Sequence, residues 1–160
     1  MWLSHTSFSN ETLSRSIWKC NKTGQQFDVY GLPGTLYGEW IVYARNGDMA
    51  YWSAVTDPVA KEGINLCADI AREHHLDDAK MHSVAYALCC DRAADGSYYR
   101  LKPYCPHCAD DNVSMVNVLD NPPQLKSFRI PKVEHDHWKR LNHDQKRQLI
   151  LDELQRLGLL

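Results

Sequence analysis

The stretch Met81–Cys108 constrains the fold most strongly, because a segment of alternating residues leads through a turn to two closely spaced cysteines. Every second residue of 82–91 faces the same side of an extended chain, which is typical of a β-strand. Asp95-Gly96 then supplies a two-residue turn, since both residues tolerate the positive φ of tight hairpins. Residues 97–104 continue the pattern as the return strand. The sequence therefore predicts a β-hairpin that ends at Cys105-Pro-His-Cys108.

This pair of cysteines indicates a metal site. Thiolates at positions i and i+3 have the spacing that a tight knuckle presents to a tetrahedral ion, usually zinc. In the register expected for the hairpin, His82 lies beside Cys105 and Cys108 and is the third candidate ligand. Cys20, at the mouth of an Asn-Lys-Thr-Gly turn, resembles half of a second knuckle whose other cysteine is missing. We therefore expect zinc to be bound by Cys105, Cys108, His82 and Cys20.

Other cysteines and histidines stay open as the third and fourth ligands. Cys89 and Cys90 lie roughly 13–17 Å back along the expected strand at ~3.3 Å per residue. Because zinc–sulfur bonds are only about 2.3 Å, a regular hairpin cannot bring both cysteine pairs to one ion. A bulge or a longer loop at 92–96 would reverse that ranking. The remaining candidates are Cys67, His74 and His107.

The tetrad Cys105-Pro-His-Cys108 also resembles the active-site tetrad of disulfide oxidases in the thioredoxin superfamily, over these four residues. The resemblance implies a redox-active cysteine pair. In that family the tetrad follows a buried strand and opens an amphipathic helix. Here the residues 109–113 lack the apolar spacing of a helix, and no βαβ unit precedes the tetrad. Metal binding is therefore the favoured interpretation.

Together with the rest of the chain, this stretch predicts a single α+β domain spanning 1–160. It is an antiparallel sheet built from hairpins, with a central helix, a C-terminal helix and a zinc knuckle on one hairpin. Asp57-Pro58 and Asn142 are good helix starts, and Gly158 is a good stop. Residues 134–137 are expected to form a polar linker. The other expected elements are a loosely ordered arm (1–12), two hairpins (13–20 with 25–30, and 35–45 with 48–55), a helix (58–75), strands (113–119 and 125–130) and a helix (142–157).

Composition narrows the class of function. Lys plus Arg number 18 against 20 Asp plus Glu, and this near balance argues against a surface devoted to nucleic-acid phosphates. No apolar run approaches membrane-spanning length, and the first residues show no secretory signal. Six cysteines then fit a reducing cytoplasm. No phosphate loop, nucleophile elbow or dinucleotide fingerprint is found, so an enzyme is not favoured.

The leading hypothesis is a small cytoplasmic, zinc-stabilised interaction module of the inhibitor, immunity or adaptor type. It would bind a protein partner without catalysis, and the apolar surplus of the C-terminal helix points to a homodimer as well. A zinc-dependent nucleic-acid binder, using Arg100, Lys102 and the C-terminal basic residues, is the first alternative. The second is a thiol–disulfide oxidoreductase in which Cys105 attacks, its pKa lowered by His107.

Overall fold

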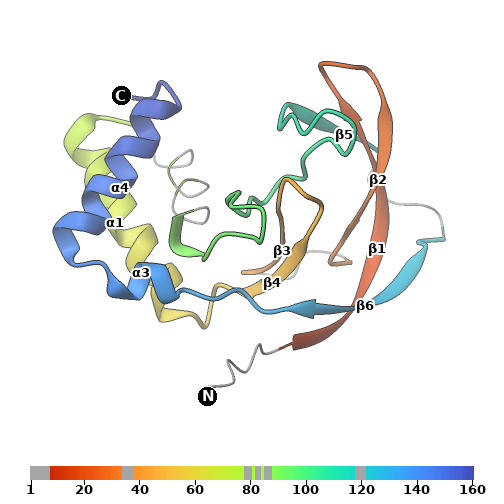
Figure 1. Ribbon diagram of the computed structural model, residues 1–160, viewed down its shortest axis with the longest axis horizontal. Helices are drawn as coiled ribbons and strands as arrows, with labels where there is room; N and C mark the ends of the chain where they lie inside the picture. Colours follow the sequence, from red (N-terminus) through yellow and green to blue (C-terminus); the bar gives the residue numbers. More distant parts are fainter. Residues whose placement is uncertain (1–7, 34–37, 78–80, 82–83, 85–87, 118–121) are drawn as a thin grey trace.

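The computed structural model describes residues 8–33, 38–77, 81, 84, 88–117 and 122–160. It is an α+β fold in which the helices gather at one end and the strands at the other (Figure 1). None of its described helices is long and apolar enough to cross a membrane. The elements in chain order are β1 (Phe8–Cys20), β2 (Gln26–Gly31), β3 (Glu39–Tyr43), β4 (Met49–Ser53), α1 (Pro58–His74), β5 (Val113–Asn117), β6 (Leu125–Pro131), α3 (Asp136–Arg140) and α4 (His143–Arg156).

Strand β1 is the centre of the larger sheet. Its second half pairs with β2 through the expected turn, with Lys19 opposite Gln26. Its first half pairs with β6, and its last residues pair with β5, where Cys20 lies opposite Val113. All these pairs are antiparallel, as the sequence predicts. The expected arm is wrong for residues 8–12, because β6 gives them a hydrogen-bonding partner; residues 1–7 lie outside the described part.

The second hairpin, β3 with β4, is confirmed. Its turn contains Asn46-Gly47, and Gly47 has a φ of +90°, which explains the glycine. Trp40 lies opposite Trp52 across the two strands. Trp52 is buried in the main hydrophobic core, and Tyr43 and Tyr51 pack against a second cluster, so these three aromatic residues serve packing, whereas Trp40 is exposed. Residues 35–37 of the expected first strand are outside the described residues.

Helices α1 and α4 form the other side of that core, and their ends match the sequence prediction closely. The Asp57 carboxylate accepts a hydrogen bond from the Val59 N–H and so caps α1, with Pro58 at the first helical position. Asn142 and Gln145 form a reciprocal capping box at the start of α4. The predicted apolar face of α1 is buried, but His74 at its end is exposed.

The hairpin expected for 81–108 is wrong. Met81, Val84 and Leu88 are helical, and so is Cys89. All four are buried in the core formed with α1 and α4. The first three lie on one helical face, because they are spaced by three and four residues. The Asp95-Gly96 turn is present, with a φ of +81° at Gly96. Of the expected return strand, only Arg100 makes a β-bridge, to Tyr43.

A short helix, α3, replaces the polar linker expected at 134–137. Trp138 is fully buried in the main core, and its burial explains why the chain folds inward here. The Asp91 carboxylate accepts hydrogen bonds from the backbone N–H groups of Asp136 and His137, the first residues of α3. A linker was predicted because residues 134–137 are all polar. The prediction failed because Trp138, which follows them directly, is buried and draws this segment into the core.

Candidate metal centre

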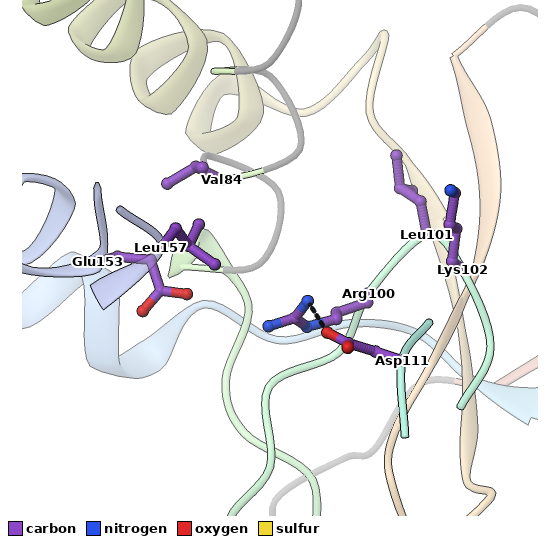
Figure 2. A pocket seen from close by; sticks show the side chains of 7 residues that line it. All are labelled: Val84, Arg100, Leu101, Lys102, Asp111, Glu153 and Leu157. Carbon is purple, nitrogen blue, oxygen red and sulfur yellow. Dashed lines mark hydrogen bonds and ion pairs between the residues drawn. The ribbon is translucent and has the colours of Figure 1, made fainter. Parts of the chain in front are cut away.

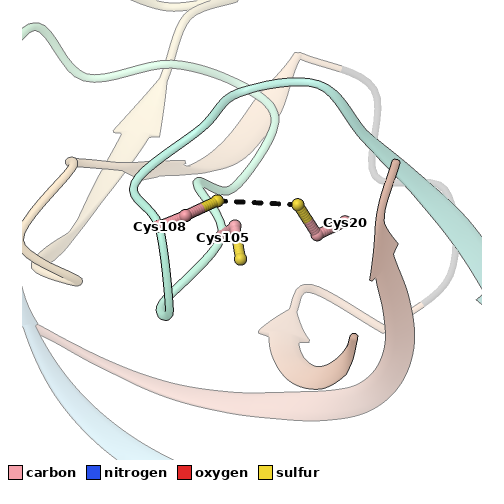
Figure 3. A group of neighbouring side chains, drawn as sticks. All are labelled: Cys20, Cys105 and Cys108. Atoms are coloured by element: carbon pink, nitrogen blue, oxygen red, sulfur yellow. Dashed lines mark hydrogen bonds between the residues drawn. The ribbon is translucent and has the colours of Figure 1, made fainter. Parts of the chain in front are cut away.

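Three cysteines from distant parts of the chain meet at one end of the larger sheet. Cys20 is the last residue of β1, and Cys105 and Cys108 lie on the loop before β5. Their sulfur atoms all lie within 4.8 Å of one another, and the Sγ atoms of Cys20 and Cys108 are 3.6 Å apart (Figure 3). Cys20 and Cys105 are fully buried, whereas Cys108 is exposed.

The pairing of β5 with β1 brings this loop to Cys20. Because Val113 lies opposite Cys20, the residues just before β5 must pass beside the β1–β2 turn. The Asn21 N–H donates to the Asn112 carbonyl at 2.9 Å, and the Asn21 side-chain amide donates to the Asn112 side chain, also at 2.9 Å. These bonds extend the ladder past Cys20 and hold the two turns side by side.

The two cysteine-bearing turns have the same backbone geometry. In each, the carbonyl of the first cysteine, Cys20 or Cys105, accepts a hydrogen bond from the N–H four residues later, at 2.8 Å in both. The N–H of that cysteine donates to the carbonyl five residues later, at 2.9 and 2.8 Å respectively. The fourth residue after the cysteine has positive φ, +77° at Gly24 and +57° at Ala109. Cys20 is therefore in a knuckle turn like that of Cys105, as its sequence suggests.

The surroundings of the cluster favour a thiolate at Cys20. A hydrogen bond from the Thr23 hydroxyl outweighs the effect of burial and, with the N–H groups of Thr23 and Lys22, lowers the pKa of Cys20 to about 7. At Cys108 the Asp110 N–H favours the thiolate, but loss of hydration and the neighbouring thiols of Cys20 and Cys105 raise the pKa. Sulfurs this close cannot all ionise cheaply unless a cation lies between them.

The sulfur positions fit a bound metal ion. Zinc–sulfur bonds of about 2.3 Å put the sulfurs of a tetrahedral site about 3.8 Å apart, close to the 3.6 Å between Cys20 and Cys108. A disulfide would need about 2.05 Å, and none of the six cysteines forms one. Thiolates are soft ligands that select zinc, copper(I) and iron–sulfur clusters. Cys20, Cys105 and Cys108 can therefore hold a metal ion.

Three of the four predicted ligands are thus brought together. The fourth, His82, lies outside the described residues. Cys67, Cys89 and Cys90 are buried in the main core, away from this cluster. Burial raises the pKa of the Cys89 and Cys90 thiols, so they stay protonated and inert there.

Cys89 and Cys90 were ranked below His82 as ligands, and their burial in the other core agrees with that ranking, although the hairpin on which it was argued is wrong. Two further candidates, His74 and His107, are exposed and do not join the cluster. The relevant residue that the sequence analysis missed is Thr23. The sequence does contain a signal for this residue, because Thr23 follows Cys20 by three residues, as Cys108 follows Cys105.

A second group of polar residues, around His135, is structural. His135 Nδ1 faces the Cys89 carbonyl at 2.5 Å, and Nε2 faces an Asp57 carboxylate oxygen, also at 2.5 Å. Both ring nitrogens thus meet oxygen atoms that can accept a hydrogen bond. The Trp52 indole donates to the same carboxylate oxygen at 2.8 Å. This buried network ties the start of α1 to β4 and to the segment before α3.

A cavity of about 430 Å³ lies between α4 and the loop around Arg100 (Figure 2). The Arg100 guanidinium on one side pairs with Asp111 at 2.6 Å. On the other side Glu153 pairs with Arg156, also at 2.6 Å. Three of the charged side chains that line the cavity, those of Arg100, Asp111 and Glu153, are therefore paired within the chain. The cysteine cluster remains the stronger candidate site.

Comparisons with protein-family models, with curated proteins and with solved structures find no match to this chain. The cysteine cluster and the surface around it are therefore the features from which function can be inferred.

Proposed function

We propose that this protein is a cytoplasmic protein-interaction module in which zinc, held by Cys20, Cys105 and Cys108, stabilises one end of the larger sheet. The convergence of the Cys20 sulfur with those of Cys105 and Cys108, 85 and 88 residues further along the chain, carries the proposal. Zinc fits because soft thiolates prefer it and because their separation matches its tetrahedral geometry. Six cysteines without a disulfide fit a reducing compartment.

The metal would compensate for a small local core. Around the cluster, the buried apolar side chains are those of Cys20, Cys105 and Val113, with Trp18 and Phe27 packed against them. Strand β5 has only five residues. In small domains a structural zinc ion supplies folding free energy, with apparent values of about 10–16 kcal/mol in zinc-finger peptides. A zinc ion here would hold β5 and the β1–β2 turn together.

The unpaired edge of β5 supports the proposal that this protein binds a protein partner. Met115 and Val116 are consecutive residues, so they point to opposite faces of the sheet, yet their exposed fractions are 47% and 50%. Within the described residues, β5 pairs with β1 alone. An edge strand with apolar side chains on both faces is the kind of surface to which an extended segment of another protein adds a strand.

Two features of the structure disfavour the alternative functions, nucleic-acid binding and thiol–disulfide exchange. Three of the basic residues expected to contact nucleic acid pair instead with carboxylates of the chain: Arg100 with Asp111, Lys146 with Glu62, and Arg147 with Glu73. These charges are already neutralised in part. For an oxidoreductase, the attacking Cys105 is fully buried and cannot reach a substrate disulfide. Cys108 is exposed, but its raised pKa disfavours the reactive thiolate.

Elemental analysis of protein purified without chelator tests the metal site. We expect one zinc per chain, and loss of zinc in Cys20→Ser and Cys108→Ser. Cys89→Ala is the matched control, because this cysteine is buried in the other core, and it should retain the metal. Absence of zinc from the wild-type chain, or its loss in Cys89→Ala alone, would contradict the proposal.

The interaction surface needs its own test. Val116→Lys places a charge on the open edge of β5, whereas Val55→Lys places one on an exposed residue outside every strand. Partner proteins recovered with the wild-type chain should be lost with Val116→Lys and retained with Val55→Lys. Equal recovery with both variants would exclude β5 as the interaction edge.

A further inference from the structure

The metal site contains three protein sulfurs, and a tetrahedral ion takes four ligands. Among the residues that the structure describes, no other Cys, His, Asp or Glu places a ligand atom in the group formed by Cys20, Cys105 and Cys108. The fourth ligand therefore comes from His82, which is not described, or from outside the chain.

The likeness of the two knuckle turns shows where the fourth position lies. Cys108 follows Cys105 by three residues and contributes its sulfur to the cluster. The residue in the same place of the other turn is Thr23, since both turns have the same hydrogen bonds and the same positive φ after them. In a site with two complete knuckles, the fourth sulfur would come from this position.

Threonine cannot replace that sulfur well. Protein ligands to zinc are thiolates, imidazoles and carboxylates, whereas the hydroxyl of threonine is neutral. The Thr23 hydroxyl already donates a hydrogen bond to Cys20 and accepts one from the Gln25 N–H at 3.3 Å. It is thus held beside the cluster as a hydrogen-bonding group rather than as a charged ligand.

The position beside Thr23 is open to solvent. Thr23 and Cys108 are both exposed, in contrast to the buried Cys20 and Cys105. Lys22, in the same turn, is exposed and lies 3.7 Å from the Asp110 carboxylate of the other turn. This ion pair links the two cysteine-bearing turns across the exposed side of the cluster.

We propose that the bound metal keeps an open fourth coordination position beside Thr23, filled by water and exchangeable for the thiolate of a small external thiol. The inference rests on the metal site proposed above. In the exchange the thiol gives its proton to solvent, its sulfur bonds to the metal, and the water leaves. No electrons are transferred. A thiolate suits the position because it completes the four-sulfur site that zinc commonly forms.

Cobalt(II) substituted into the full chain makes the ligand set visible, because each thiolate adds to the sulfur-to-cobalt charge-transfer absorption. Thr23→Cys supplies the missing sulfur and should raise this absorption in the ratio of four thiolates to three. Gln26→Cys is the matched control, since it adds an exposed cysteine outside the turn, and it should leave the absorption unchanged. His82→Ala should also leave it unchanged.

The exchange itself is tested with 2-mercaptoethanol. Added to the cobalt-loaded wild-type chain, it should raise the absorption to the level of Thr23→Cys, without loss of cobalt on gel filtration. It should have no effect on Thr23→Cys, in which the position is closed. An unchanged wild-type spectrum, release of cobalt, or a spectrum altered by His82→Ala would overturn the open position. Failure of the wild-type chain to bind cobalt would instead overturn the metal site.

Discussion

Replacement of Asp57 by Asn tests the buried network around His135. The asparagine keeps the size of the side chain and an oxygen that can cap α1, but it removes the negative charge that faces the His135 ring. Removing one partner of a buried ion pair costs about 3–5 kcal/mol. The Asp57 side chain is 18% exposed and that of His135 only 7%. We therefore expect a loss near the lower end, about 3 kcal/mol, in the free energy of unfolding.

For a chain of this length, a loss of that size lowers Tm by about 6–12 °C. Chemical denaturation at pH 7 measures the free energy, and Asp69→Asn is the matched control. Asp69 pairs with Arg72 on the exposed face of α1 at 3.3 Å, where both side chains are more than half exposed. Such a pair contributes about 0.2–1 kcal/mol. A cost of Asp57→Asn as small as that of Asp69→Asn would refute a stabilising role for the buried Asp57 carboxylate.

The pH dependence has a definite sign. Burial alone would raise the pKa of Asp57, but the hydrogen bond from Trp52, the charge of His135 and the Val59 N–H together hold it below its ordinary value of 3.8. A carboxyl whose pKa is lowered by folding adds stability above its unfolded pKa and loses that contribution as pH falls. The difference between the wild-type chain and Asp57→Asn should therefore be full at pH 7 and shrink below about pH 4.

Three further predictions concern the metal, the core and the helix cap. Treatment with EDTA should speed amide hydrogen exchange in β5 and in the β1–β2 turn while leaving α1 unchanged; equal acceleration everywhere would contradict a local role for the metal. Trp138→Ala should cost about 3–5 kcal/mol in urea denaturation, because the fully buried indole leaves a cavity among α1 and α4. Asn142→Ala should cost about 1 kcal/mol through loss of the capping box, whereas Asn142→Ser should cost little.

Local chemistry explains which elements were predictable. Asn46-Gly47, Asp57-Pro58 and Asn142 act through bonds to residues within a few positions, so the second hairpin and the starts of both long helices follow from short stretches of sequence. The spacing of Cys105 and Cys108 is equally local. It predicted two thiols on one turn without any knowledge of the fold.

The segment after Met81 shows where local patterns fail. Its apolar residues recur both at every second position and at intervals of three and four, so strand and helix were both compatible with them. The helical conformation of Val84 and Leu88 is selected by packing, since it buries both against the core of α1 and α4. No local signal distinguishes the two periods in such a short segment.

The sequence alone determined the turns, the caps and the paired cysteines at 105 and 108, because each depends on neighbours along the chain. The turn after Cys20 made this residue a candidate ligand, but only the tertiary structure brings its sulfur to those of Cys105 and Cys108. That contact depends on the register between β1 and β5, strands separated by more than 90 residues. Strand register is set by the whole sheet and its core, and a change of one residue would turn Cys20 to the other face.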